Sequence, residues 1–248
     1  RETRERKGYL AAPGIIAPSH NVLAAVEGAT DLTATPRTVL PNSYAAPRPE
    51  VLSAARPEPD ILFIGRFDYL KGGDTVLQAF ARLAETHPDV RLSFAGPDKG
   101  LRETDGRSTD ISAMLATLPE DIRARVIYLG PIDRAEVARL RATHAICLIA
   151  SRYENLNYSL LEAMAAGQAI VCTRVGGPSE VLEDGKTALL VPPGDPEAMA
   201  AALSQVLEDT ALTRRLGEAA RQTLEADFDP THVARQTANF IGGILDKG

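Results

Sequence analysis

From Asp60 onward, short hydrophobic runs alternate with longer amphipathic stretches. Six runs have strand length and are apolar at nearly every position: 61–65, 92–96, 126–130, 145–150, 169–173 and 188–191. Continuous hydrophobicity is typical of parallel strands that are covered on both faces. Helical stretches fall between most of them, at about 74–87, 134–143, 157–166, 178–182 and 196–207. Repeated β–α units predict an α/β fold with a doubly wound parallel sheet, that is, a Rossmann-like domain at residues 60–226.

The first sixty residues follow a different pattern. A short strand at 14–18, a helix at 20–27 with Ser19 as its N-cap, and a second short strand at 37–40 form one strand–helix–strand unit. Such a unit is too small to have a core of its own, so residues 1–44 are expected to be the end of a preceding α/β domain. Residues 45–59 are rich in proline and alanine and are interpreted as a linker. The polar stretch 99–110 predicts a loop, and Pro230 begins a last helix.

The composition of the chain argues against several classes of protein. The 248 residues are 44% hydrophobic, which is enough for a sizeable core, and the net charge of −6 argues against a general nucleic-acid surface. The two cysteines, Cys147 and Cys172, lie in apolar runs and are expected to be buried, reduced thiols of a cytoplasmic protein. No apolar run approaches the roughly 18 residues of a membrane span. The chain opens without methionine on a charged run, so we expect it to be a piece of a longer protein.

Two cations follow the first predicted strand. Arg66 comes directly after Gly65, and Lys71 lies just before the next helix, beside Gly72 and Gly73. In open α/β sheets ligands bind at the carboxyl ends of the strands, and an arginine with a lysine there suits a diphosphate. The alternative is a pair of solvated surface cations. The flanking glycines, which permit close backbone approach, favour phosphate binding, although neither a P-loop nor a G-x-G-x-x-G fingerprint is present.

Two acids follow the fourth predicted strand in an E-x(7)-E arrangement. Glu154 comes soon after the strand, and Glu162 lies inside the next helix, so both are expected to face one crevice. The helix start near Asn157 would favour an anionic phosphate. Glu162 could then accept hydrogen bonds from ribose hydroxyls, and Glu154 could contact a sugar. Taken singly, Glu154 could be a helix cap and Glu162 a solvated helix residue.

Together these segments resemble a known family. The segment GRFDYLKGG, the E-x(7)-E pair before AMAAG, and Gly176-Gly177 with Glu180 are similar to the retaining glycosyltransferases of family 4, among the group 1 glycosyltransferases. The resemblance covers about residues 60–226. It implies the two-domain GT-B fold, with this chain as the C-terminal donor-binding domain plus a remnant of the N-terminal acceptor domain. Residues 227–248 would form the helix that crosses back to the N-terminal domain.

The resemblance also implies roles for single residues. Arg66 and Lys71 would stabilise the leaving diphosphate, so that neither a metal nor another cofactor is needed. Glu162 would bind the ribose, and Glu154, counted with the two cations as catalytic, would lie near the transferred sugar. The implied donor-binding residues are Gly65, Arg66, Lys71, Gly130, Ile132, Glu154, Leu156, Asn157, Tyr158 and Glu162.

The chain departs from the family pattern after the first glutamate. The family often has an aromatic residue and a glycine there, whereas this chain has Asn155-Leu156-Asn157-Tyr158. We expect the tolerance of asparagine for left-handed backbone to preserve the tight approach. Tyr158 adds bulk near the sugar, which leaves the donor sugar open. Gln168 stands where the family commonly has proline.

The predicted function is transfer of a hexosyl unit, with retained configuration, from a UDP-, GDP- or ADP-linked sugar. The acceptor would be a hydroxyl of a saccharide or lipid-linked saccharide, and the piece alone would bind nucleotide but transfer sugar poorly. Two alternatives stay open: a GT-B-like phosphorylase or synthase, and a non-catalytic Rossmann-like nucleotide-binding subunit. The predicted location is cytoplasmic, with peripheral membrane association through the missing domain left open.

Overall fold

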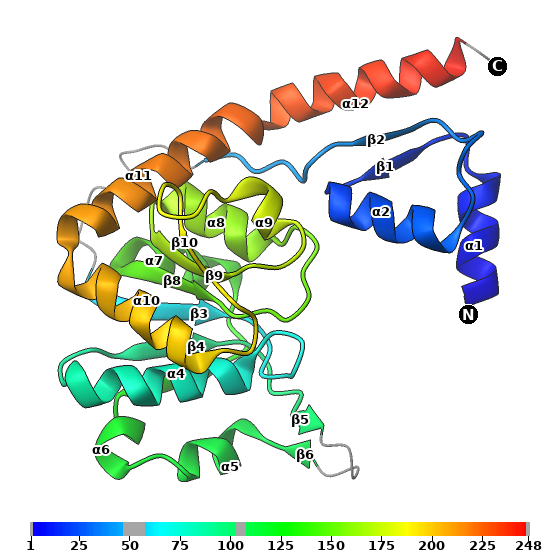
Figure 1. The fold of residues 1–248 in the computed structure, drawn as a ribbon. Helices are drawn as coiled ribbons and strands as arrows, with labels where there is room; N and C mark the ends of the chain where they lie inside the picture. The colour runs from blue at the N-terminus through cyan, green and yellow to red at the C-terminus, as the bar shows by residue number, and fades with distance from the viewer. Residues whose placement is uncertain (1, 47–57, 103–107, 247–248) are drawn as a thin grey trace.

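The computed structural model describes residues 2–46, 58–102 and 108–246, which form a large and a small unit (Figure 1). The large unit contains a six-stranded sheet in the order β10-β9-β8-β3-β4-β7, with every neighbouring pair parallel. The strands are β3 (Glu58–Ile64), β4 (Leu92–Ala95), β7 (Val126–Gly130), β8 (His144–Ile149), β9 (Ala169–Thr173) and β10 (Leu189–Val191). The predicted α/β fold with a doubly wound parallel sheet is confirmed.

Helices cover both faces of this sheet. On β3, Ile61 and Phe63 face a core that includes Phe80 of α4, whereas Leu62 between them packs with Leu140 of α7. This alternation explains why residues 61–64 of the strand are apolar at every position. The helices of the large unit are α4 (Gly73–Thr86), α5 (Ile111–Ala116), α6 (Glu120–Arg123), α7 (Arg134–Thr143), α8 (Tyr158–Ala166), α9 (Pro178–Val181), α10 (Pro196–Glu208) and α11 (Thr210–Asp227).

The strand order reverses between β3 and β8. From β3 the chain proceeds to β4 and β7 on one side, and it then returns to β8, β9 and β10 on the other side. In open α/β sheets the connections diverge at such a switch point and leave a crevice at the carboxyl ends of the two strands. The loops that follow β3 and β8 are those with the predicted cations and with Glu154.

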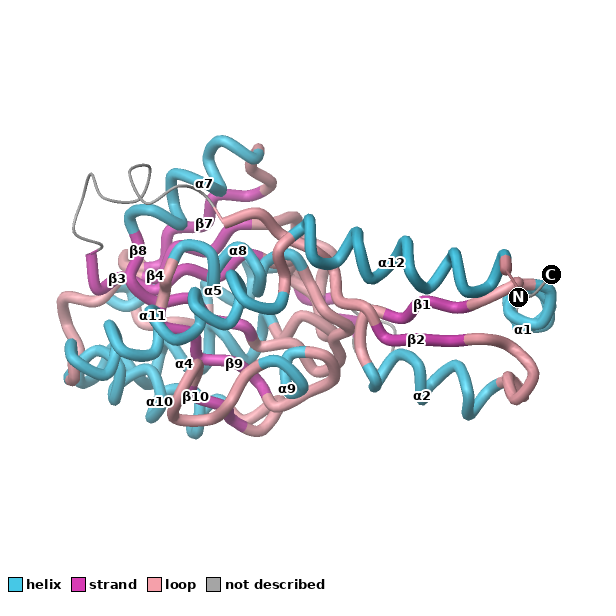
Figure 2. The backbone as a smooth tube through the Cα atoms, turned by 90° about the horizontal axis from the view of Figure 1, so that it is seen from above, coloured by secondary structure: helices cyan, strands magenta, loops and turns pink. Residues whose placement is uncertain are grey.

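The small unit contains two parallel strands, β1 (Ile15–Ala17) and β2 (Arg37–Val39), joined by α2 (His20–Ala29). Ser19 caps α2 as predicted, because its side-chain oxygen accepts a hydrogen bond from the Val22 amide at 3.2 Å. The last helix, α12 (Pro230–Leu245), leaves the large unit and lies beside β1 (Figure 2). The two elements are so close that a Cβ on Gly14 would overlap the side chain of Ile244. The division of the chain into domains stays a prediction.

Several elements differ from the sequence prediction. A helix not predicted from the sequence, α1 (Glu2–Ala11), has mostly exposed residues and no hydrophobic periodicity. The predicted loop 99–110 contains two short antiparallel strands, β5 (Leu101–Arg102) and β6 (Ser108–Thr109), while 103–107 lie outside the described residues. Residues 47–57 of the predicted linker also lie outside the described residues. The strand β3 begins at Glu58, which pairs with His144, and therefore includes the last two residues of that linker.

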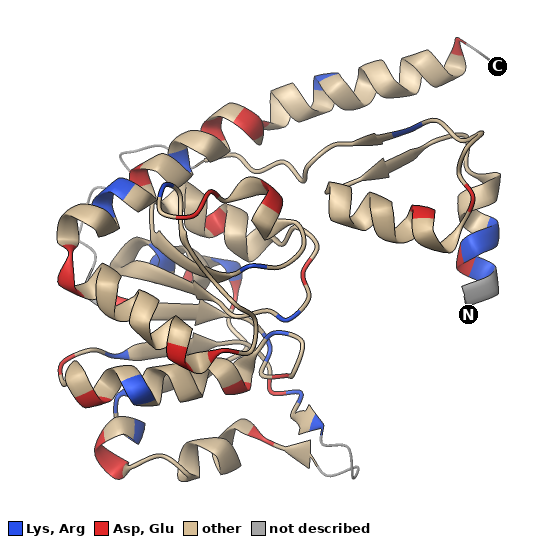
Figure 3. Ribbon diagram, viewed as in Figure 1, with Lys and Arg blue, Asp and Glu red and all other residues tan. Residues whose placement is uncertain are grey.

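Acidic and basic segments are interspersed over both units (Figure 3). Cys147 and Cys172 are free and buried, as predicted. Burial raises the pKa of the Cys172 thiol, which keeps that thiol protonated. None of the helices in the described part of the chain combines the length and hydrophobicity that a bilayer span requires.

Candidate functional site

A cavity of about 370 Å³ lies at the carboxyl ends of β3, β4 and β8, at the switch point of the sheet. Five predicted donor-binding residues line it: Gly65, Arg66, Lys71, Ile132 and Asn157. The remaining lining comes mainly from the ends of the three strands and from Ser159 at the start of α8. The topology therefore brings the two predicted cations and the helix start to one hollow.

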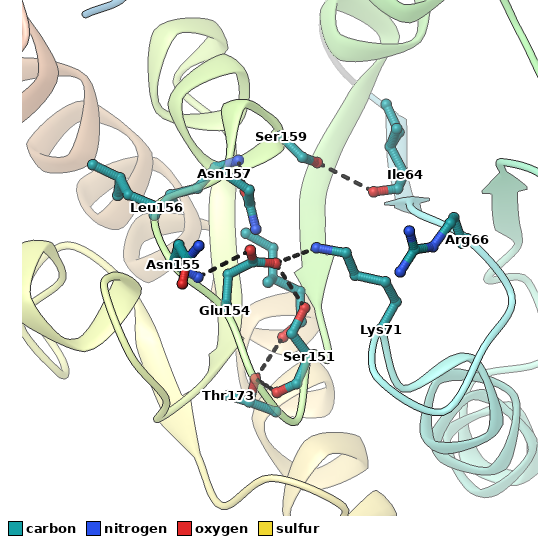
Figure 4. Close-up of polar contacts among 12 residues, drawn as sticks. Ile64, Arg66, Lys71, Ser151, Glu154, Asn155, Leu156, Asn157, Ser159 and Thr173 are labelled. Atoms are coloured by element: carbon teal, nitrogen blue, oxygen red, sulfur yellow. Dashed lines mark hydrogen bonds and ion pairs between the residues drawn. The ribbon is translucent and has the colours of Figure 1, made fainter. Parts of the chain in front are cut away.

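Lys71 and Glu154 meet beside this cavity (Figure 4). The ammonium group of Lys71 forms an ion pair with Oε2 of Glu154, which also accepts a hydrogen bond from Ser151 Oγ at 3.1 Å. The other carboxylate oxygen, Oε1, accepts from the Asn155 amide at 3.2 Å. Glu154 is only 7% exposed. It is therefore a buried, hydrogen-bonded carboxylate rather than a solvated loop residue or a helix cap.

Asp68, which the sequence analysis did not single out, connects the two cations. Its Oδ2 accepts a hydrogen bond from Arg66 Nε at 2.7 Å, and its Oδ1 accepts from the Lys71 amide, also at 2.7 Å. The Arg66 side chain is about half exposed and reaches the cavity from the same loop as Lys71. Asp68 thereby fixes the loop that presents both cations.

Arg152 ties this loop to the end of β8. Its guanidinium forms two parallel hydrogen bonds with the carboxylate of Asp74, at 2.7 and 2.6 Å, and lies 4.1 Å from the centre of the Tyr69 ring. Its backbone amide donates to the Leu70 carbonyl at 2.8 Å. Such a forked pair has a defined geometry, so it restrains the loop between β3 and α4.

The start of α8 differs in detail from the prediction. The helix begins at Tyr158, and Asn157 is its N-cap, with extended backbone (φ −90°) and a side-chain oxygen that accepts from the Leu160 amide at 2.7 Å. The expectation that asparagine here uses left-handed backbone is wrong, since no described non-glycine residue has positive φ. The close approach comes instead from Gly176 and Gly177, where a Cβ would overlap the carbonyl oxygens of Glu154 and Asn155 respectively.

Glu162 lies in a neighbouring cavity of about 610 Å³. Tyr44, Arg134, Arg141 and Tyr158 line it too, and it adjoins the first cavity through Val137, which lines both. Burial raises the pKa of Glu162, and the positive charge of Arg141 opposes this effect. The two acids of the E-x(7)-E pair therefore do not share one crevice: Glu154 pairs with Lys71 at the first cavity, and Glu162 lines the second.

The other predicted site residues differ in burial and in their contacts. Gly130 has a positive φ of 65°, and its carbonyl accepts a hydrogen bond from the Gly96 amide at 2.8 Å. The side chain of Leu156 is buried in the core, and its carbonyl accepts from Asn42 Nδ2 at 2.7 Å. Tyr158 is 55% exposed at the second cavity.

Arg141 is another residue near the site that the sequence analysis did not single out. It lies on α7, is 4% exposed, and extends between α7 and α8. Its guanidinium donates to the carbonyl and Oγ of Ser159, to Oε1 of Gln168 and to Sγ of Cys147, and it lies 3.7 Å from Oε2 of Glu162. Nothing in the sequence distinguished it from Arg134 and Arg139 on the same helix. Among the described residues, no cluster of three His, Cys, Asp or Glu side chains could hold a metal ion.

Comparison with known proteins shows the family of this chain. The family model for group 1 glycosyl transferases matches residues 48–223. Glycogen synthase of Mycobacterium tuberculosis (strain ATCC 25618 / H37Rv) is 34% identical over 195 residues, which are 79% of this chain and 44% of that protein. N-acetyl-alpha-D-glucosaminyl L-malate synthase of Bacillus anthracis is 34% identical over 186 residues, 75% of this chain and 45% of that protein. The chain thus spans less than half the length of these curated relatives.

Solved structures agree on the fold. Sucrose-phosphate synthase from Thermosynechococcus elongatus superimposes with a TM-score of 0.82 at 26% identity, over 100% of this chain and 62% of that one. Anabaena HepE in complex with UDP-glucose gives a TM-score of 0.78 at 23% identity, over 94% and 64% of the two chains. The match of the family model over most of the chain settles the family: this chain belongs to the group 1 glycosyl transferases.

Proposed function

We propose that this chain binds the nucleotide diphosphate of a sugar donor at the switch point and takes part in transfer of a hexosyl unit to a hydroxyl acceptor. The observation that carries the proposal is the position of Arg66 and Lys71. Both reach the cavity from the end of β3, and the N-terminus of α8 lies on its other side. The similar fold of HepE, solved with UDP-glucose, supports the choice of ligand.

We propose positions for the diphosphate, the ribose and the base of the donor. The diphosphate would lie between the two cations and the first turn of α8, whose amides lack partners within the helix. The ribose would extend toward the second cavity, where the carboxylate of Glu162 can accept hydrogen bonds from its hydroxyls. The base would lie near Gly130 and Ile132, the second of which lines the first cavity.

The chemistry we propose is electrostatic. As the bond between the sugar and the diphosphate breaks, negative charge grows on the departing phosphate, and Arg66 and Lys71 stabilise it without a metal ion. Glu154 holds the ammonium group of Lys71 in place, close to where the sugar would lie. We propose that the sugar is transferred with retained configuration, to a saccharide or a lipid-linked saccharide.

The length of the chain affects the activity that we expect when the chain is tested by itself. We propose that it is the donor-binding half of a GT-B enzyme in which most of the acceptor site belongs to the other domain. It should then bind nucleotide but transfer sugar slowly or not at all. The curated relatives are more than twice as long as the segments that match this chain. Comparing the transfer rate of this chain with that of a longer version that includes the other domain therefore tests the proposal.

Calorimetry with UDP, GDP and ADP tests the binding proposal. We expect at least one of the three to bind, and Arg66→Ala to weaken its binding at least about tenfold, since a charge-assisted hydrogen bond is worth about 1.5–3 kcal/mol. Arg214→Ala is the matched control, because Arg214 is exposed on α11 and lies outside both cavities. If none of the nucleotides binds the wild type, or if Arg66→Ala behaves like the control, the proposal is wrong.

A further inference from the structure

We propose that Arg141 is a positioning residue that holds Glu162 and the first turn of α8 in place for the donor's ribose and diphosphate. This inference rests on the proposed function above and adds to it a residue outside the predicted donor-binding set. Arg141 is almost completely buried, and it lines the second cavity but not the first. It acts through the side chains and carbonyl that it contacts.

The contacts of Arg141 converge on α8. One terminal nitrogen donates to the Ser159 carbonyl at 2.8 Å and to Ser159 Oγ at 2.7 Å, in the first turn of the helix. Ser159 Oγ in turn donates to the Ile64 carbonyl, at 3.3 Å, at the end of β3 (Figure 4). Arg141 therefore helps to hold the N-terminus of α8 against the strand that precedes Arg66. The amides of that helix start are the groups proposed to meet the phosphate.

The same nitrogen lies 3.7 Å from Oε2 of Glu162, one turn further along α8. Among the described residues, Glu162 is the only acid within ion-pair distance of Arg141. A cation beside a partly buried acid favours the ionised form of that acid, so Arg141 offsets part of the rise in pKa that burial causes at Glu162. Arg141 thus favours the ionised form of Glu162, and a carboxylate accepts hydroxyl hydrogen bonds better than a neutral acid does.

The other terminal nitrogen of the guanidinium holds Arg141 through contacts outside α8. It donates to Oε1 of Gln168 at 2.9 Å and to Sγ of Cys147 at 3.0 Å, while Gln168 Nε2 donates to the His144 carbonyl at 2.9 Å. Gln168 is the residue that stands where the sequence resemblance leads one to expect proline. A proline has no side-chain acceptor, so this departure supplies a hydrogen-bond partner for a buried cation.

The charged and titratable groups around Glu162 come from three segments. Arg141 and Arg134 belong to α7, Tyr44 precedes the large unit, and Tyr158 lies on α8 itself. Burial and the charge of Glu162 raise the pKa of the Tyr44 hydroxyl, so that it stays neutral. Arg134 lowers the pKa of Glu162 less than Arg141 does. Removal of Arg141 should therefore move the protonation of Glu162 to higher pH.

The test is calorimetry between pH 5 and pH 8, with whichever of UDP, GDP and ADP binds the wild type most tightly. Arg141→Met should weaken binding about tenfold at pH 7 and raise the pH at which affinity is lost on acidification. Arg139→Met is the matched control, because Arg139 lies on the same helix, is exposed and pairs with Glu136. In a Glu162→Gln background, Arg141→Met should no longer shift the pH profile. Titration of the nucleotide affects all variants alike.

Each outcome has a distinct meaning. Failure of the wild type to bind any nucleotide overturns the proposed function and this inference with it. If the wild type binds and Arg141→Met matches Arg139→Met in affinity and pH profile, only the inference is wrong. If the pH shift persists in the Glu162→Gln background, Arg141 does not act through Glu162, which also overturns it. Should Arg141→Met fail to fold, Arg141→Lys replaces it: the retained charge should preserve the wild-type pH profile with weaker affinity, and unchanged affinity would refute the role.

Discussion

The ammonium group of Lys71 and the carboxylate of Glu154 form an ion pair that joins the loop after β3 to the loop after β8. These strands are the neighbours on either side of the switch point. The pair therefore spans the place where an open α/β sheet offers a ligand crevice. Because Glu154 also accepts hydrogen bonds from Ser151 and Asn155, its position is fixed by more than Lys71.

The ion pair leads to a stability prediction. Lys71→Ala leaves the buried Glu154 carboxylate without its cation and should destabilise the fold by about 1–3 kcal/mol in urea unfolding. Lys186→Ala is the control: Lys186 and Glu183 form an exposed pair, which should contribute about 0.5 kcal/mol or less. The double variant Lys71→Ala, Glu154→Gln should recover part of the loss, because no buried charge remains. Equal effects of Lys71→Ala and Lys186→Ala would contradict this account.

The sheet could be predicted from sequence because its signal is local. Each of the six strands overlaps one of the predicted, nearly continuous apolar runs, and the observed bounds differ from the predicted ones by at most three residues. The helix α1 could not be predicted, since it buries almost no side chain and its charges follow no helical period. The short helices α5 and α6 lack the length over which a period of 3.6 residues is recognisable.

The site could be predicted only in part. Arg66 and Lys71 stood out because they follow a strand end, where ligand contacts gather. Arg141 and Arg152 could not be identified this way, because their roles depend on Ser159, Gln168 and Asp74, which are distant from them in sequence. The position of Glu162 in the second cavity, away from the pair of Glu154 with Lys71, likewise depends on how α7 packs on α8, and no sequence spacing encodes that.

Glu162 should show a conflict between stability and binding. Burial raises its pKa, so the folded state holds the proton more tightly than the unfolded state does. The resulting stabilisation is present below the unfolded pKa and is lost as pH rises through the folded pKa. At pH 7 the ionised acid therefore costs stability, and Glu162→Gln should raise the melting temperature there, with no gain below the unfolded pKa.

The same variant should weaken nucleotide binding about tenfold, because a neutral amide is a poorer acceptor for hydroxyl groups than a carboxylate is. Thermal unfolding at several pH values and calorimetry measure the two effects. Glu218→Gln on α11 is the control, since Glu218 is exposed and outside both cavities. A variant that is less stable at pH 7 yet binds nucleotide normally would show that Glu162 serves the fold instead.

Gly177 should tolerate no side chain. Its φ of −57° suits any residue, so an alanine there would be limited by space alone. The added Cβ would overlap the carbonyl oxygen of Asn155, and Gly177→Ala should cost about 1–3 kcal/mol by forcing the loop after Glu154 to move. Gly242→Ala in α12 is the control, because open space surrounds that position and alanine favours helix. Similar unfolding midpoints for both variants would refute the argument.

Arg152 should control the order of the loop that contains Arg66 and Lys71. Arg152→Ala removes both bonds to Asp74 and the contact with the Tyr69 ring, so the amides of residues 66–73 should exchange hydrogen faster. Nucleotide binding should weaken about tenfold as the cations lose their fixed positions, because ordering them again costs entropy. Arg152→Lys, which keeps the charge but not the planar fork, should lie between alanine and the wild type.

Arg174→Ala is the matched control for Arg152→Ala. Arg174 forms a single exposed ion pair with Asp184, and its loss should leave exchange in the 66–73 loop unchanged. If Arg152→Ala accelerates exchange throughout the large unit, then Arg152 stabilises the whole fold and not this loop in particular. If exchange accelerates in the loop while binding stays at the wild-type level, the order of the loop does not limit capture of the nucleotide, and the cations need no fixed position to bind it.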